Sequence, residues 1–162
     1  MLSVNIRKTS IKDIPRIVEL WKALTKHHVR ELGFGKGLYK LKKGIGPGYG
    51  KFVKKQIRSR NAAVFVAENE NKLIGFALVY IQKLPPIFVH DKEAYVSDIF
   101  VEDLYRRKGL GSMLLREAEK WADEKGIFSL GLVVDTKNDA ALAAYRKFGF
   151  FEHRFKMSKI IK

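Results

Sequence analysis

Residues 101–112, which read VEDLYRRKGLGS, combine three consecutive cations and two glycines at a point where a strand is expected to turn into a helix. Free backbone N–H groups at the start of a helix, together with its positive dipole end, bind anions. Glycine at positions 109 and 111 lets a ligand approach the main chain closely. The segment therefore predicts a phosphate site, with a plain tight turn as the alternative.

A second pair of candidate residues is Asn138 and Tyr145, which lie seven residues apart in an alanine-rich segment. Seven residues make nearly two helical turns, so both side chains share one helix face, roughly 10 Å apart along the axis. They can contact one elongated ligand, and a phenol can protonate a leaving group. The alternatives are structural, because Asn138 suits a helix N-cap and Tyr145 can be a buried packing residue.

Several other chemistries lack their motifs. The chain has no GxxxxGK followed by Ser or Thr, no strict GxGxxG and no GxSxG, so ATP hydrolysis, a Rossmann dinucleotide site and a hydrolase elbow are without support. It has no cysteine, and His27 and His28 are adjacent with no carboxylate at ligand spacing, so we expect no metal site.

The spacing of apolar and polar residues indicates the elements that must position these groups. A strand over 4–7 precedes a helix that a capping box of Ser10 and Asp13 opens. The seven glycines between Gly33 and Gly50 predict a loop. Beyond it we expect a short helix over 52–60, a hairpin over 62–67 and 73–81, and a central strand over 94–101. In that central strand, Tyr95 and Ser97 alternate onto the face opposite to Asp98. The remaining expected elements are a helix over 109–125, a strand over 129–134, a helix from Asn138 to Gly149, and one or two closing strands over 150–161.

Composition limits the class of protein. A chain of 162 residues with 46% apolar residues predicts one compact domain over 1–162. The polar N-terminus and the absence of a long apolar run predict neither a signal peptide nor a membrane span, and with no cysteine the expected location is the cytoplasm. The net charge is +15, and residues 1–60 hold 16 basic and 3 acidic side chains. Such a segment is either a solvated surface or a face for an acidic partner, nucleic acid or the ribosome.

Residues 106–111, RRKGLG, resemble the Arg/Gln-x-x-Gly-x-Gly/Ala signature of the GNAT superfamily of N-acetyltransferases. The preceding SDIFVEDLY and the later NDAALAAYRKFGF are similar to that family's central strand and its Asn-to-Tyr helix. The resemblance implies an α/β fold with a mixed, largely antiparallel sheet, a bent central strand and flanking helices. It also implies acetyl transfer from acetyl-coenzyme A (acetyl-CoA) to a primary amine by direct attack, and dimers are common in the family.

The resemblance assigns roles to individual residues. The turn would bind the coenzyme pyrophosphate, the central strand would pair its main chain with the pantetheine arm, Asn138 would contact that arm, and Tyr145 would protonate the departing thiolate. The cofactor-binding residues implied in the turn and strand are Ile99, Phe100, Val101, Arg106, Arg107, Lys108, Gly109, Leu110, Gly111 and Ser112.

The general base is assigned less directly. A free amine with a pKa of ~10.4 is mostly protonated at neutral pH, so the attack needs a base. Several family members carry a glutamate near position 97, where this chain has Ser97, so the family pattern does not transfer here. Asp98 is the first candidate for catalysis, and a structural hydrogen bond is its alternative. Glu93, His90 or a chain of waters are the other candidates.

Charge is the one property of the sequence that limits the class of the acceptor amine. Lys36, Lys40, Lys42, Lys43 and Lys51 would repel a polyamine, although parts of 98–112 are similar to the diamine acetyltransferases. Neutral or acidic acceptors are therefore expected, whether a small amine, an amino acid, a protein N-terminus or a lysine. The competing hypothesis is a non-catalytic acyl-CoA sensor, or a basic nucleic-acid or ribosome adaptor on the same fold.

Overall fold

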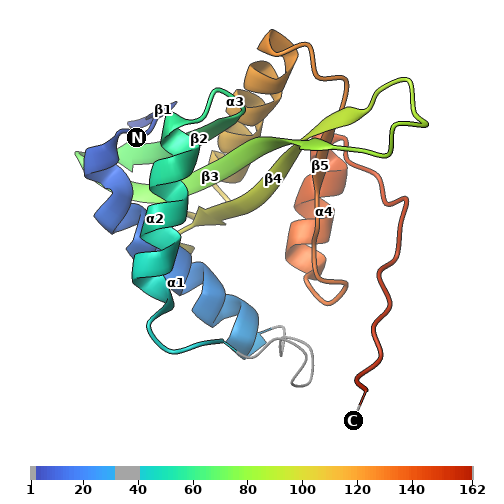
Figure 1. Cartoon of the computed structure of the whole chain (residues 1–162). Coiled ribbons are helices and arrows are strands. Elements are labelled where there is room, and N and C mark those ends of the chain that lie inside the picture. The colour runs from blue at the N-terminus through green and yellow to red at the C-terminus, as the bar shows by residue number, and fades with distance from the viewer. Residues whose placement is uncertain (1–2, 32–40, 162) are drawn as a thin grey trace.

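The core of the protein is a five-stranded sheet in the order β1-β2-β3-β4-β5 (Figure 1). The computed structural model describes residues 3–31 and 41–161. The strands are β1 (Val4–Lys8), β2 (Ala62–Asn69), β3 (Lys72–Lys83), β4 (Lys92–Val101) and β5 (Leu130–Leu132). The first four pair antiparallel and β5 pairs parallel to β4, which confirms the expected mixed, largely antiparallel α/β sheet.

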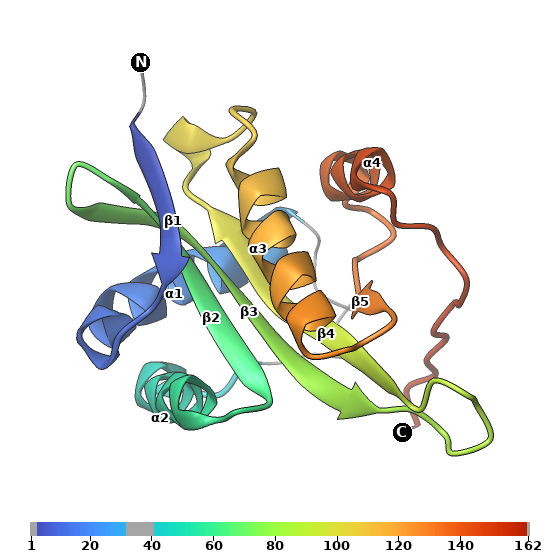
Figure 2. The same ribbon diagram turned by 90° about the horizontal axis from the view of Figure 1, so that it is seen from above.

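Helices cover both faces of this sheet (Figure 2). The short η1 (Ile11–Asp13), α1 (Ile14–Glu31) and α2 (Ile45–Arg58) lie on one face; α3 (Leu110–Glu124) and α4 (Asp139–Phe148) lie on the other, and η3 (Asp103–Tyr105) joins β4 to α3. The predicted capping box is confirmed at the start of η1, where the backbone N–H of Ser10 donates to the Asp13 carboxylate at 2.7 Å.

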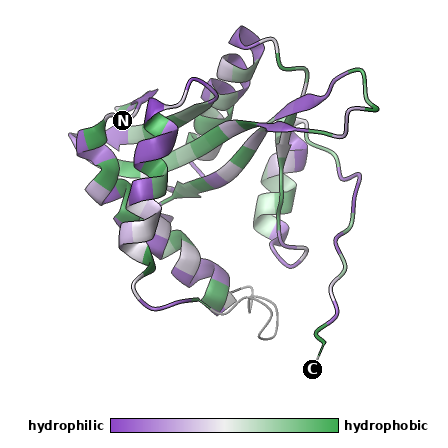
Figure 3. Cartoon of the chain, viewed as in Figure 1, coloured by the Kyte–Doolittle hydropathy of each residue, from purple (hydrophilic) through white to green (hydrophobic). Residues whose placement is uncertain are grey.

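Alternating side chains of the strands fill two apolar layers, one on each side of the sheet. Val64 and Phe76 pack with α1 and α2, whereas Phe65 and Ala77 pack with α3. Figure 3 shows the apolar residues concentrated along the strands and the inner faces of the helices. The predicted hairpin is confirmed, and its two turn residues, Glu70 and Asn71, both adopt the left-handed conformation that a tight hairpin turn needs.

The glycine-rich segment was predicted to be a loop up to Gly50, and this is wrong for residues 45–50. They form the first half of α2, which begins seven residues before the predicted helix and ends at Arg58; residues 32–40 lie outside the described part of the chain. Gly46 and Gly50 face α1, and a Cβ at Gly46 would come within 2.7 Å of Lys22. Close packing between two helices thus outweighs the low helix propensity of glycine.

The predicted closing strands are absent from the part of the chain that the structure describes. Residues 149–161 contain no strand, and Figure 1 shows them leaving α4 as an extended tail. Phe155 is 85% exposed and Met157 is 93% exposed, so neither packs against the sheet. A strand needs a partner for its backbone hydrogen bonds, and residues 150–161 pair with no strand in the described part of the chain.

Among the described residues, none of the helices is both long enough and apolar enough to cross a membrane.

Candidate active site

The central feature of the site is a split between β4 and β5. Their pairing covers Ala94–Val96 and Leu130–Leu132 and stops there, while β4 continues to Val101 (Figure 2). On that side of β4, the main chain of Ile99, Phe100 and Val101 has no strand partner among the described residues. The bent central strand is therefore present. Since the Glu102 N–H donates to the Ile74 carbonyl, alternation along β4 directs the main-chain groups of Ile99 and Val101, rather than those of Phe100, toward the split.

A β-bulge at Ser97 changes which side chains of β4 share a face. Leu78 of β3 is opposite Asp98 and Val79 is opposite Val96, so Ser97 is an extra residue in the strand. Simple alternation predicted Tyr95 and Asp98 on opposite faces. That prediction is wrong, because the extra residue shifts the parity and places both on the face covered by α1 and α2.

The environment of Asp98 is aromatic. Its half-buried carboxylate accepts a hydrogen bond from the Ser97 hydroxyl at 2.8 Å. Burial raises the pKa of Asp98, against the lowering effect of Ser97 and of the nearby Tyr49 hydroxyl and Trp21 indole. The buried Tyr49 hydroxyl faces this carboxylate without a hydrogen bond of regular geometry.

Two ring pairs complete the surroundings of this carboxylate. Trp21 and Tyr49 stack with centroids 4.1 Å apart, and the rings of Tyr80 and Tyr95 are 5.6 Å apart. The charge of Asp98 contributes to the raised pKa of each of the three tyrosines, which places all of them near it. We call Trp21, Tyr49, Tyr80, Tyr95 and Asp98 the Asp98 cluster.

The turn between β4 and α3 has the backbone that an anion site requires. Arg107 and Gly109 have φ of 59° and 81°, and Gly109 is the N-cap of α3 with no side chain capping the helix. The first N–H groups of a helix have no partner within it. At Gly109 and Gly111 a Cβ would meet nothing within 4 Å, so the main chain is open to a ligand there.

The three cations of the turn do not act alike. The Arg106 side chain folds back, donating from Nε to the Val101 carbonyl at 2.9 Å and pairing with Asp103 at 2.9 Å. Lys108 donates to the Leu104 carbonyl at 3.1 Å. Arg107 is exposed and has no ion pair or hydrogen bond within the described residues. Arg106 and Lys108 therefore shape the turn, and Arg107 is the cation left for a ligand.

The sequence predicted that Asn138 could cap a helix, and this is confirmed. Its Oδ1 accepts a hydrogen bond from the Ala141 N–H at 3.2 Å as the N-cap of α4.

On the same helix, Tyr145 is half-buried and packs edge-on against Phe150, with the ring centroids 5.8 Å apart. Burial raises the pKa of Tyr145 to about 12, so the phenol stays protonated at neutral pH. Its hydroxyl makes no hydrogen bond with any described residue.

The predicted catalytic residues thus lie on opposite faces of the sheet. Asp98 faces α1 and α2 on one side of the sheet, whereas Tyr145 packs with the layer of α3 on the other side. The β4–β5 split is the opening in the sheet between these two sides. Sequence reasoning missed Trp21 and Tyr49 as site residues. Trp21 belongs to the apolar stripe of α1, and Tyr49 lies in the segment predicted to be a loop, so no local pattern could have found them.

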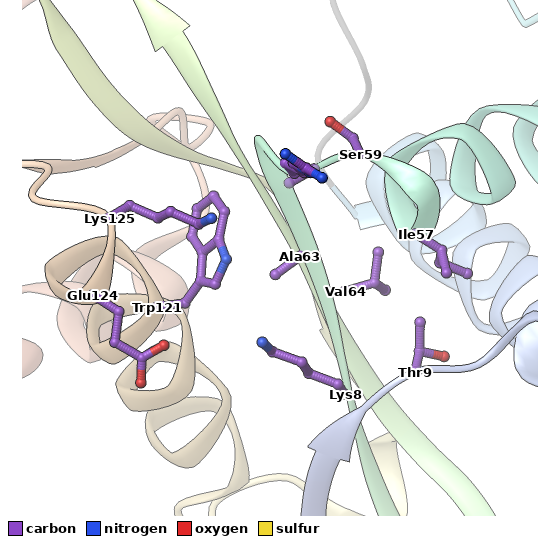
Figure 4. A pocket seen from close by; sticks show the side chains of 11 residues that line it. Lys8, Thr9, Ile57, Ser59, Ala63, Val64, Trp121, Glu124 and Lys125 are labelled. Carbon is purple, nitrogen blue, oxygen red and sulfur yellow. The ribbon is translucent and has the colours of Figure 1, made fainter.

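A cavity of about 350 Å³ lies at the opposite edge of the sheet, where Lys8, Trp121 and Glu124 border it (Figure 4). β1 and β2 line this cavity, and β3 separates them from the two strands of the β4–β5 split. Within residues 3–31 and 41–161 there is no group of three or more His, Asp or Glu side chains that could hold a metal ion.

Comparison with known families agrees with this geometry. The model of the acetyltransferase (GNAT) family matches residues 38–150, which is more than half of the chain. The chain belongs to the GNAT family. The GNAT resemblance of the turn, the central strand and the Asn-to-Tyr helix is therefore confirmed.

Individual GNAT relatives are distant. The chain is 31% identical over 104 residues to the uncharacterized N-acetyltransferase YhfO of Bacillus subtilis, covering 62% of this chain and 66% of that one, slightly less than two thirds. Its fold is similar to a predicted acetyltransferase of Clostridium acetobutylicum solved with acetyl-CoA, with a TM-score of 0.80, 19% identity and coverage of 97% and 96%. It is also similar to the aminoglycoside N-acetyltransferase AAC(6')-Iy in complex with CoA, with a TM-score of 0.79, 16% identity and coverage of 100% and 97%.

Proposed function

We propose that this GNAT domain, taken as residues 1–162, transfers an acetyl group from acetyl-CoA to a primary amine. The observation that carries the proposal is the β4–β5 split, which has an open glycine turn at one end, a carboxylate of raised pKa on one side and a protonated phenol on the other. The cytoplasm is the proposed location, because a chain without cysteine suits a reducing compartment.

The residues of the split fit acetyl-CoA, which supplies a reactive acetyl thioester when bound. The free N–H groups from Gly109 to Ser112 would hold its pyrophosphate, with Arg107 as the available cation. On the β5 side of β4, the Ile99 main chain and the Val101 N–H would pair with the amide groups of its pantetheine arm, whereas the Val101 carbonyl accepts from Arg106 and Phe100 pairs with β3. Asn138 would contact the same arm from the start of α4.

Two side chains would move protons. An acceptor amine is mostly an ammonium ion at neutral pH, and Asp98, whose pKa is raised by burial, would accept its proton at a carboxylate oxygen. The Tyr145 hydroxyl would donate its proton to the sulfur of the departing thiolate. A phenol with a pKa of about 12 keeps that proton until the leaving group carries charge.

The test is release of free coenzyme A thiol from acetyl-CoA, with and without primary amines. Release that depends on the amine, with the N-acetyl product identified by mass spectrometry, is the expected result. Tight binding of acetyl-CoA without release from any amine would instead support the acyl-CoA sensor. Salt-dependent binding of RNA without release would support the basic adaptor, whose surface would include the exposed Lys51, Lys54 and Lys55 of α2.

We also propose that two copies pair through the C-terminal tail, residues 150–161. Phe151, Phe155 and Met157 are exposed and alternate with polar residues, as in a half-buried strand. The outer edge of β5 has no strand partner among the described residues. An open edge and an unpaired alternating segment are complementary, and exchange of tails between two copies would satisfy both symmetrically.

Light scattering after size-exclusion chromatography measures this pairing. We expect residues 1–162 to have twice the mass of one chain, and a chain shortened to end at Phe150 to have the mass of a monomer. A shortened chain that stays dimeric, or a full chain that is monomeric at tens of micromolar, would contradict the exchange. Exposed Lys159→Glu, which changes charge without removing an apolar contact, is the control expected to stay dimeric.

A further inference from the structure

We infer that the acceptor of this site is a dicationic amine, held along β4 with its reacting ammonium at Asp98 and its second cationic group at Glu93. The inference rests on the proposed acetyl transfer and names the chemical class of the amine. Three features carry it: the aromatic surroundings of Asp98, the position of Glu93 on the same face, and the exposure of the described lysines to solvent.

The Asp98 cluster suits an ammonium ion. A carboxylate among aromatic rings loses hydration, which is why burial dominates the raised pKa of Asp98. A bound ammonium offsets that cost through its charge and through contact with the ring faces. The Ser97 hydroxyl donates to one carboxylate oxygen, Oδ2, and the Tyr49 hydroxyl and the Trp21 indole lie nearby, so a bound ammonium would share the carboxylate with these donors.

Glu93 is the second carboxylate on this face. Gln82 donates to its Oε1 at 2.5 Å, and its Oε2 lies over Gly131 of β5, where a Cβ would come within 2.5 Å. Glycine at position 131 is therefore what leaves room for this carboxylate. Tyr95 comes between Glu93 and Asp98 along β4, and the charges of both carboxylates contribute to its raised pKa.

The strand register sets the spacing that a ligand must match. Asp98 is opposite Leu78 and Glu93 is opposite Gln82, which are four residues apart along β3. At about 3.3 Å per residue, the two backbone positions are on the order of 13 Å apart, and the side chains can shorten this distance. Two amino groups on a chain of about eight carbons can bridge it.

Three of the lysines that led the sequence to predict a neutral or acidic acceptor lie in the described part of the chain, and all three are exposed. Lys36 and Lys40 lie outside the described residues, and Lys42 and Lys43 are exposed ahead of α2. Lys51 is also exposed, on the face of α2 opposite to the buried Tyr49 and Val53. Solvent screens the charge of these exposed lysines, and no Lys or Arg is among the groups that shift the pKa of Asp98.

Three acceptors of equal length test the inference in the thiol-release assay: diaminooctane, aminooctanol and aminooctanoate. They present the same reacting amine and differ only in the charge of the far end. We expect kcat/KM to be highest for diaminooctane, about tenfold lower for aminooctanol and about tenfold lower again for aminooctanoate. A difference of this size is typical of a partly buried contact between charges. Equal rates, or preference for aminooctanoate, would overturn the dicationic acceptor and leave acetyl transfer standing. No release with any of the three would contradict the acetyl transfer itself.

Glu93→Gln locates the second cationic group. We expect the ratio of kcat/KM for diaminooctane over aminooctanol to fall about tenfold in this variant. A fold defect would lower both rates and leave their ratio unchanged, so the ratio isolates the charge contact. Glu119→Gln, which removes the same charge from the exposed face of α3, should keep the wild-type ratio. An unchanged ratio in Glu93→Gln would overturn the assignment.

Discussion

Tyr145→Phe should lower kcat for thiol release by about a hundredfold to a thousandfold, within the range that a lost general acid gives. The dissociation constant of acetyl-CoA should change little, because the aromatic ring and its contact with Phe150 remain. Stability should also change little, since the hydroxyl makes no hydrogen bond with the described residues. Steady-state kinetics, acetyl-CoA titration and thermal unfolding measure the three quantities.

The same substitution separates catalysis from packing. If Tyr145 is only a packing residue of α4, phenylalanine should replace it with no loss of rate. Tyr105→Phe removes the same atom from η3, where the ring contacts Lys72 and Lys108, and should keep the wild-type kcat. A Tyr145→Phe enzyme with more than half of the wild-type kcat would rule out the phenol as proton donor.

Gly111→Leu should weaken acetyl-CoA binding by about a hundredfold, as expected for loss of one or two hydrogen bonds to a charged group at about 1.5–3 kcal/mol each. A Cβ at Gly111 meets no protein atom within 4 Å, so a leucine side chain would occupy open space beside the N–H groups proposed to hold the pyrophosphate. Leucine is also a better helix former than glycine, so the unfolding temperature should stay the same or rise. Titration with acetyl-CoA and thermal unfolding check both expectations.

The matched control is Gly48→Leu. Gly48 also lies in a helix, α2, with nothing within 4 Å of an added Cβ, and it is far along the chain from the glycine turn. Its leucine variant should gain similar stability and keep wild-type affinity for acetyl-CoA. Equal affinities in Gly111→Leu and wild type would show that the start of α3 does not hold the coenzyme.

The sequence determined the elements whose signals are local. The capping box at Ser10, the hairpin with its turn at Glu70 and Asn71, and the N-cap at Asn138 each depend on neighbouring residues, so spacing alone predicts them. The family signature in RRKGLG belongs to the same class, because a backbone anion site is built from consecutive residues.

Only the tertiary structure decided which side chains meet. Gly46 and Gly50 became helical because α1 packs closely against them, and the bulge at Ser97, visible only in the pairing of β3 with β4, turned Tyr95 onto the face of Asp98. The C-terminal tail shows the converse, since its alternating pattern is that of a strand and it pairs with no strand among the described residues. Strand register and helix packing are set by contacts between distant residues, and a local pattern holds no information about them.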